Sequence, residues 1–221
     1  MKLTAFQYGK TEITEAMAFP NGNPEIKLPI SLLFFLIETG DKKILADVGC
    51  DTMPGFVVTE FQKPVEVLES YGIARDEITD IILTHSHHDH AECLSYYSQA
   101  NVYIHESESE DVIKYSANAE NIQTFRDSIR ISEGITIKHI GGHTRGSAIV
   151  LLSLPETTYV LCGDECYTKE NLLNKTITGC SFCPEKSMAF TEEYTKSCYH
   201  TLLFHDPDIV GKTGFKTIIE Q

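Results

Sequence analysis

The pattern of apolar and polar positions predicts more strands than helices in the first part of the chain. Residues 3–8 alternate in the way expected of an edge strand. The apolar runs 31–38 and 43–47 are separated only by Thr39-Gly40-Asp41-Lys42, which predicts a hairpin of two mostly buried strands.

The remaining pattern places helices between further strands, so we expect an α/β protein. Helices are predicted at 65–71, 91–97, 106–116 and 185–196, and the acidic face of 106–116 is expected to be solvated. Strands are predicted at 78–84, 101–105, 129–131, 135–140, 148–153, 158–162 and 201–204, and loops at 18–29 and 50–64.

The strongest chemical signal directly follows the apolar run 81–83. His85, His87, Asp89 and His90 place three imidazoles and one carboxylate within six residues, at the turn after a predicted strand. Imidazole and carboxylate groups are preferred ligands of zinc and other first-row divalent ions. This segment therefore predicts a metal site on a loop at the edge of a sheet.

Composition fits one soluble domain over residues 1–221. The chain is 42% hydrophobic and 23% charged, which is ordinary for a globular protein. Its net charge of −14 argues against a nucleic-acid partner and against anionic membranes, since both require clustered basic residues. A small-molecule partner remains, and the oligomeric state is left open.

Cysteine usage and the first residues indicate a cytoplasmic protein. Residues 1–7 lack the charged and apolar regions of a signal peptide, and the apolar run 30–37 is too short to span a membrane. Seven cysteines without an export signal favour reduced thiols. Cys180 and Cys183 have CxxC spacing, and without a second such pair we expect buried thiols there.

The HxHxDH segment and three later residues together resemble the metallo-β-lactamase superfamily. His143 lies in a Gly-Gly-His-Thr turn, Asp164 follows Gly163, and His205 precedes Asp206. The resemblance covers nearly the whole chain and implies an αββα sandwich. It also includes Asp47, in an early Asp-Val-Gly turn, as a residue that orients a ligand imidazole.

Within that superfamily the chain is most similar to the N-acyl homoserine lactonases, which quench quorum sensing. Residues 164–171, Asp-Glu-Cys-Tyr-Thr-Lys-Glu-Asn, resemble the segment with their bridging aspartate and active-site tyrosine. The resemblance implies that a hydroxide bridging two metal ions attacks the ester carbonyl of a lactone. Asp89 and Tyr167 are then the expected catalytic residues, with the Tyr167 phenol donating to the developing oxyanion.

The resemblance also implies how two divalent metal ions would be held. We expect zinc, with iron, manganese or cobalt as alternatives, since His/Asp sites accept each of them. One ion would be bound by His85, His87 and His143, the other by Asp89, His90 and His205, and Asp164 would bridge both.

Departures from the lactonase pattern fall on the expected substrate pocket. Ala91-Glu92-Cys93-Leu94 replaces a glycine-rich continuation, and Arg145 stands where a proline is common. An apolar acyl chain requires an apolar wall. The residues expected to form it lie in loops at strand ends: Phe19, Met53, Phe56 and Phe182.

Other functions remain as alternatives. A thioester hydrolase of the glyoxalase II type would keep the metal ligands, but such enzymes carry an additional C-terminal helical domain, and 16 residues follow His205. A secreted β-lactamase is disfavoured by Asp164, and a diiron oxygen reductase by His87. A non-catalytic metal-binding scaffold would be distinguished by a hydrolysis assay with added metal.

Overall fold

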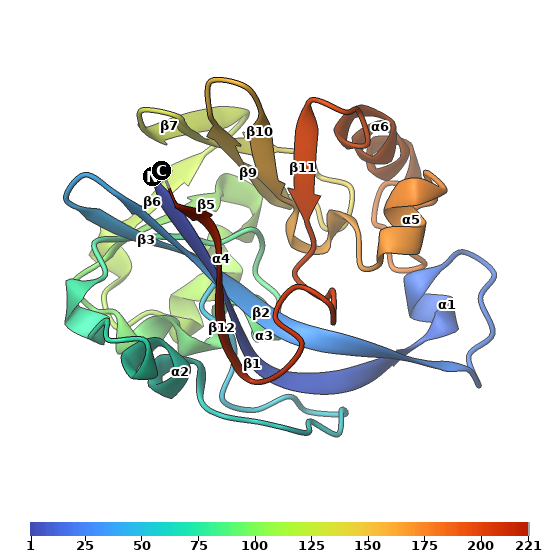
Figure 1. Ribbon diagram of the computed structural model, residues 1–221, viewed down its shortest axis with the longest axis horizontal. Coiled ribbons are helices and arrows are strands. Elements are labelled where there is room, and N and C mark those ends of the chain that lie inside the picture. Colours follow the sequence, from blue (N-terminus) through green and yellow to red (C-terminus); the bar gives the residue numbers. More distant parts are fainter. Residues whose placement is uncertain (221) are drawn as a thin grey trace.

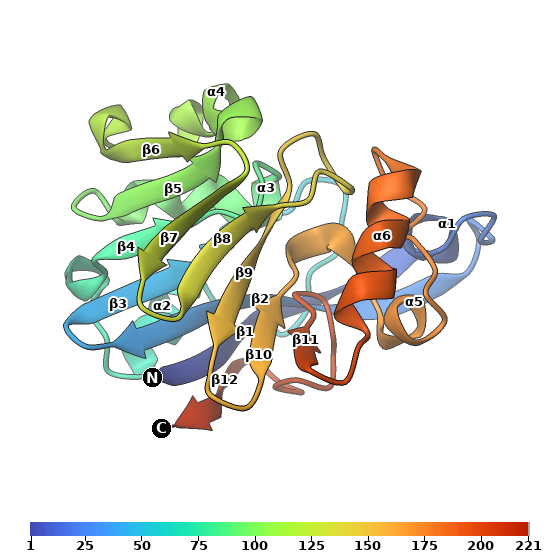
Figure 2. The ribbon, with the colours of Figure 1, turned by 90° about the horizontal axis from the view of Figure 1, so that it is seen from above.

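The computed structural model, which describes residues 1–220, contains two β-sheets packed face to face with helices on their outer sides (Figure 1). Viewed from above, the strands of the second sheet cross over those of the first, and α6 and α5 lie beside the second sheet (Figure 2). The predicted αββα sandwich is therefore confirmed.

The larger sheet has seven strands in the order β12-β1-β2-β3-β4-β5-β6. β3, β4, β5 and β6 are parallel to one another, whereas β12, β1, β2 and β3 pair in antiparallel fashion. The bounds are β1 Lys2–Thr14, β2 Lys27–Thr39, β3 Lys42–Ala46, β4 Asp80–Ile82, β5 Asn101–His105, β6 Ile122–Phe125 and β12 Gly214–Glu220.

The smaller sheet has five strands in the order β11-β10-β9-β8-β7. β7 to β10 are antiparallel neighbours, and β11 is parallel to β10. The bounds are β7 Ser128–Ser132, β8 Ile135–His139, β9 Ala148–Ser153, β10 Thr158–Leu161 and β11 Tyr199–Leu202.

The apolar run in β2 is continuous because both faces of this strand are buried. Successive side chains of a strand point to opposite faces. Leu33 and Phe35 pack into the core between the two sheets, whereas Phe34 and Leu36 pack into a second core beneath the outer helix α2. A central strand buried on both sides reads as an apolar run without alternation.

The helices are short and cover the outer faces of the sheets. α2 packs beside β1, and α6 packs on the second sheet through Phe190 and Tyr194. The α-helices are α1 Glu15–Ala18, α2 Pro64–Ser70, α3 His88–Ala91, α4 Ser109–Val112, α5 Lys169–Leu173 and α6 Pro184–Tyr194. Short 3-10 helices span Arg75–Glu77, Glu92–Tyr96, Glu106–Glu108, Ile113–Tyr115, Ala119–Asn121 and Gly163–Glu165. No helix in the described range combines the length and apolar character needed to cross a bilayer.

Several predicted elements are corrected by the structure. β1 is not an edge strand, because β12 pairs with it from Lys2 opposite Glu220 onward, and β12, β6 and α5 were not predicted. The helix expected at 106–116 is three short pieces, since serine and acidic side chains compete for backbone hydrogen bonds. Its Glu108 is buried rather than solvated.

The topology brings the ends of six strands to one edge of the sandwich. β3, β4 and β5 are parallel, so the residues that follow them emerge on the same side. In the second sheet β8, β10 and β11 run in a common direction and end on one side as well. Asp47, His85 and Glu108 follow the first three ends, and His143, Asp164 and His205 follow the other three.

Candidate metal centre

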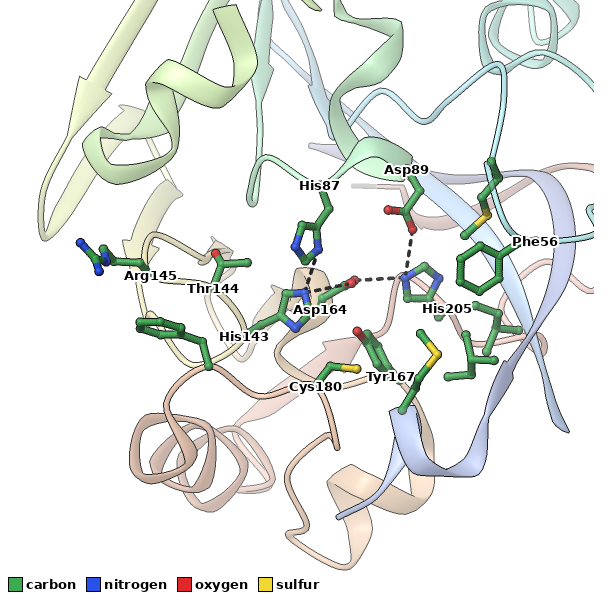
Figure 3. Close-up of a pocket in the computed structure, with 15 residues that line it drawn as sticks. Phe56, His87, Asp89, His143, Thr144, Arg145, Asp164, Tyr167, Cys180 and His205 are labelled. Carbon is green, nitrogen blue, oxygen red and sulfur yellow. Dashed lines mark hydrogen bonds and ion pairs between the residues drawn. The ribbon is translucent and has the colours of Figure 1, made fainter. Parts of the chain in front are cut away.

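Seven ligand-type side chains converge at this edge, from four separate segments of the chain. Figure 3 shows five of them pointing toward one another above Tyr167. Their potential ligand atoms form two groups, and within each group all atoms lie within 4.8 Å of one another. One group is His85, His87, His143 and Asp164, and the other is Asp89, His90 and His205.

The Asp164 carboxylate lies between the two groups. Its Oδ1 is 3.1 Å from Nε2 of both His90 and His205. Its Oδ2 is 3.4 Å from Nε2 of His143 and 3.7 Å from Nε2 of His85. Each oxygen therefore faces a different group of imidazoles, as a carboxylate shared between two cations would.

Hydrogen bonds fix which imidazole nitrogen faces the centre. Nδ1 of His90 donates to Asp47 Oδ2 at 2.6 Å, and Nδ1 of His205 donates to the Ser31 carbonyl at 3.0 Å. Nδ1 of His85 lies 3.0 Å from the Thr84 hydroxyl, which itself donates to Asp47. With the proton on Nδ1, each Nε2 lone pair is free to bind a cation.

The position of the Asp47 carboxylate is fixed by its own backbone and by hydrogen bonds other than the one from His90. Its backbone is in the left-handed region at φ 60°, and its carboxylate also accepts from the Thr84 backbone N–H at 2.8 Å. A left-handed conformation is uncommon for a residue other than glycine, although aspartate adopts it more readily than most. Asp47 thus connects the turn after β3 to the HxHxDH segment that follows β4.

The atoms that face the centre fit a divalent cation. Among residues 1–220, Nε2 of His85, Nε2 of His90 and Oδ1 of Asp164 are buried without a hydrogen-bond partner. A buried polar atom without a partner costs free energy, and a cation bound between these lone pairs removes that cost. The donor set of imidazoles and carboxylates is also the set that zinc and similar ions prefer.

Burial and charge act differently on the two groups. Burial lowers the pKa of His143 to about 4 and holds that of His85 well below its usual range, so both imidazoles are neutral. Burial also opposes protonation of His90, but the carboxylates of Asp164 and Asp47 outweigh it and raise its pKa. The second group therefore concentrates negative charge that a cation would balance.

Two buried carboxylates that the sequence did not single out hold the ligand loops together. Glu108 Oε1 accepts from the Thr144 hydroxyl at 2.7 Å and from the Gly146 N–H at 2.9 Å. Its Oε2 accepts from the Ser86 N–H at 3.1 Å and from the Ser86 hydroxyl. Glu108 thus joins the loop of His85 and His87 to the loop of His143.

Glu165 is the second of these carboxylates. Its Oε1 accepts from the backbone N–H groups of Gly142 and His143, at 3.1 and 3.3 Å, and from the Ser147 hydroxyl at 2.5 Å. A Cβ at Gly142 would lie 2.2 Å from Glu165 Oε2, so only glycine allows this approach. Burial raises the pKa of Glu165 to about 7. No local pattern marks either glutamate, because their partners lie 18–38 residues away.

A third group of potential ligands, Cys50, His88 and Glu92, lies nearby. Each is already engaged within the fold. His88 contacts the Thr52 carbonyl at 2.8 Å and the Tyr115 hydroxyl at 3.2 Å, and Glu92 accepts from the Asp51 N–H at 2.5 Å. We therefore interpret this group as a hydrogen-bonded support of the loop after β3.

A cavity of about 520 Å³ opens beside the ligand groups. Met53, Phe56 and Phe182, which the sequence analysis placed in a pocket wall, line it, and so do Ile13, Met17 and Ile30, which it did not name. Phe19 is not part of this lining within the described residues. Its ring packs instead with the buried cluster of Ile13, Ala18, Ile30 and Tyr167.

Tyr167 lines the same cavity and is 6% exposed. Its ring lies 5.5 Å from that of His205 and 5.8 Å from that of His143. Burial raises its pKa well above 10, so the phenol stays protonated and can donate a hydrogen bond. Cys180 lines the same cavity.

The cysteine prediction for residues 180 and 183 is wrong. Cys180 is exposed at the cavity and Cys183 is partly exposed, whereas Cys50, Cys93, Cys162 and Cys166 are the buried thiols. Cys180 and the nearby Phe182 line the cavity instead of entering a core, which local spacing does not reveal.

Comparison with known protein families gives a match to the metallo-beta-lactamase superfamily over residues 33–179. Among curated relatives, the N-acyl homoserine lactonase AiiB of Agrobacterium fabrum is 24% identical, over 82% of this chain and 80% of that protein. The AiiB protein of Rhizobium rhizogenes is 23% identical over the same shares.

Solved structures of this fold are also similar. A probable metal-dependent hydrolase from Staphylococcus aureus superposes with a TM-score of 0.80 at 20% identity, covering 92% of this chain and 88% of that one. An N-acyl homoserine lactone hydrolase, solved with N-hexanoyl-L-homoserine bound at its catalytic metal centre, gives a TM-score of 0.80 at 19% identity and covers 93% of both chains. The dizinc quorum-quenching lactonase AidC gives 0.75 at 14% identity, over 99% of this chain and 94% of that one.

Proposed function

Because the chain belongs to the metallo-beta-lactamase superfamily, we propose that it is a dinuclear metal-dependent hydrolase that opens the ester ring of a lactone such as an N-acyl homoserine lactone. The observation that supports this best is the Asp164 carboxylate between two groups of ligand-type atoms, beside a cavity with an apolar side.

We assign each of the two groups of side chains to one metal ion. His85, His87 and His143 would hold one ion, Asp89, His90 and His205 the other, and Asp164 both. Bound divalent ions would supply a hydroxide at neutral pH and polarise the ester carbonyl. Zinc is the proposed metal, and iron, manganese or cobalt suit the same donors.

The protein's own side chains would orient the ester and move its protons. The acyl part would lie on the side of Met53 and Phe56, away from water. Tyr167, protonated because it is buried, would donate to the carbonyl oxygen as negative charge develops there.

Asp89 would complete ring opening. Its side chain lines the cavity, and its Oδ2 lies 3.7 Å from His90 Nε2 and 3.8 Å from His205 Nε2. In the overall step the oxygen of water bonds to the carbonyl carbon and the bond to the ring oxygen breaks. Asp89 would hold the proton that the ring oxygen takes up, so that lactone and water give one hydroxy acid.

The first test combines metal analysis with a substrate panel. Metal-replete protein should contain two transition-metal ions per chain, and Asp164→Asn should lower both occupancies because one carboxylate serves both ions. With added Zn²⁺ or Mn²⁺, the protein should hydrolyse lactones faster than thioesters or phosphodiesters. One ion or fewer per chain would refute the dinuclear site, and preference for a thioester would refute the lactonase assignment.

A further inference from the structure

The cavity has two chemically different ends. Figure 3 shows Arg145 and Thr144 on one side of the histidines and Phe56 on the opposite side. The Phe56 end is apolar, with Ile13, Met17, Ile30 and Met53 also in the lining. The other end is lined by Arg145 and Thr144, and the Arg145 guanidinium lies on its outer side, away from the histidines (Figure 3).

The Arg145 guanidinium has no carboxylate partner within the described residues. Its recorded side-chain contact is with the ring of Phe182, whose centroid lies 6.0 Å from Cζ. Other exposed basic side chains among residues 1–220, such as Arg130, also lack an ion pair, but Arg145 is the basic residue in the lining of this cavity. A cation at a cavity, left unpaired in an acidic protein, is available to an anion from outside.

The backbone around Arg145 is fixed on both sides. The Thr144 hydroxyl and the Gly146 N–H both donate to Glu108, at 2.7 and 2.9 Å. The Arg145 carbonyl accepts from His139 Nε2 at 3.0 Å. The loop therefore fixes the backbone of Arg145, so that only the side chain has to be ordered when it binds a ligand.

We propose that Arg145 binds an anionic group of the substrate, which is then an ester or lactone with an apolar part and, at the other end, a carboxylate or similar oxyanion. This inference rests on the hydrolase function proposed above. The planar fork of a guanidinium matches a carboxylate with two parallel hydrogen bonds. Arg145 would also offset, at the cavity, the repulsion of an anionic substrate by a protein of net charge −14.

A matched pair of esters tests the proposal. 4-Methylphenyl hexanoate and 4-carboxyphenyl hexanoate have the same acyl chain and differ in a methyl group or a carboxylate on the leaving phenol, the part that lies toward Arg145 when the acyl chain lies toward Phe56. The quantity compared is kcat/KM for the anionic ester divided by kcat/KM for the neutral ester. We expect Arg145→Ala to lower this ratio about tenfold and Arg145→Lys to lower it less. Arg130→Ala removes an exposed arginine on β7 and should leave the ratio unchanged.

Two results would overturn the proposal: an unchanged ratio in Arg145→Ala, or an equal fall in Arg130→Ala. If the wild-type protein hydrolyses no ester or lactone, the proposed function fails and binding decides the role of Arg145. Ligand-observed NMR with the same two esters should then show that Arg145→Ala weakens binding of the 4-carboxyphenyl ester more than that of the 4-methylphenyl ester. Equal weakening would overturn the proposal.

Discussion

The Tyr167 hydroxyl faces the proposed metal ligands from a ring fixed in a buried cluster with Ile13, Ala18 and Ile30. We expect Tyr167→Phe to lower kcat on a lactone by about 10- to 1,000-fold, because one donor to the developing oxyanion is lost. The smaller loss applies if bound metal shares that charge. Metal content and Tm should stay unchanged, since the ring remains.

Tyr159→Phe is the matched control for Tyr167→Phe. Tyr159 lies on β10 and stacks on His200, with ring centroids 5.0 Å apart, so its hydroxyl is not part of the cavity lining. A Tyr167→Phe enzyme as active as this control would show that Tyr167 serves packing alone. The lactonase proposal would then depend on family membership, which does not fix substrate.

At the scale of elements, the structure depends on links between loops more than on regular helices. Glu108 joins the loop after β4 to the loop between β8 and β9 through the N–H groups of Ser86 and Gly146. These two loops hold His85, His87 and His143. The first group of ligands is thus assembled by a side chain that belongs to neither loop.

Glu108→Gln should therefore weaken metal binding. An amide places donors against the N–H and hydroxyl groups that Glu108 now accepts from, leaving buried donors unpaired at a cost of about 1–3 kcal/mol. Losing such a supporting contact typically lowers metal affinity about 10- to 100-fold. Competition with a chelator would measure the affinity, and thermal unfolding the stability.

Glu106→Gln supplies the control for that measurement. Glu106 lies two residues earlier and forms an exposed ion pair with Arg126, at 2.8 Å between Nε and Oε2. Exposed pairs of this kind contribute about 0–1 kcal/mol, so stability and metal affinity should barely change. Equal metal affinity in both variants would show that Glu108 does not position the ligands.

At the scale of the whole molecule, β12 closes the larger sheet beside the N-terminal strand. It pairs with β1, buries Ile219 and brings Phe215 to within 4.8 Å of the Tyr71 ring, measured between centroids. The two ends of the chain meet here, as Figure 1 shows. An unpaired β1 would present open N–H and C=O groups to other chains.

A chain that ends at Thr213 should unfold at a lower temperature than the full chain and should self-associate more. The lost burial should cost several kcal/mol, and each kcal/mol lowers Tm by about 2–4 °C in a protein of this size. Calorimetry and light scattering over a range of concentrations would measure both effects. Lys216→Ala, on the exposed side of β12, should change neither the unfolding temperature nor the self-association. A truncated chain that matches this variant in both measurements would refute this role of β12.

Local patterns were sufficient to predict the parts of this protein that depend on neighbouring residues. The alternation and runs of apolar positions predicted β2, β3, β5, β9 and β10, because strand periodicity is a local property. The HxHxDH spacing placed four ligand-type side chains in one short segment, which in the structure spans the turn after β4 and α3. The family resemblance, since confirmed, added His143, Asp164 and His205 as the later residues of the proposed site.

Only the tertiary structure decided the features whose partners are distant in the chain. β12 pairs with a strand more than 200 residues away, and the partners of Glu108 lie 22 and 38 residues from it. Their stabilisation comes from contacts that exist only after folding, so no local signal marks them. The same holds for the cavity, where Ile13, Phe56 and Arg145 become neighbours of the metal ligands because the ends of strands from both sheets meet at one edge.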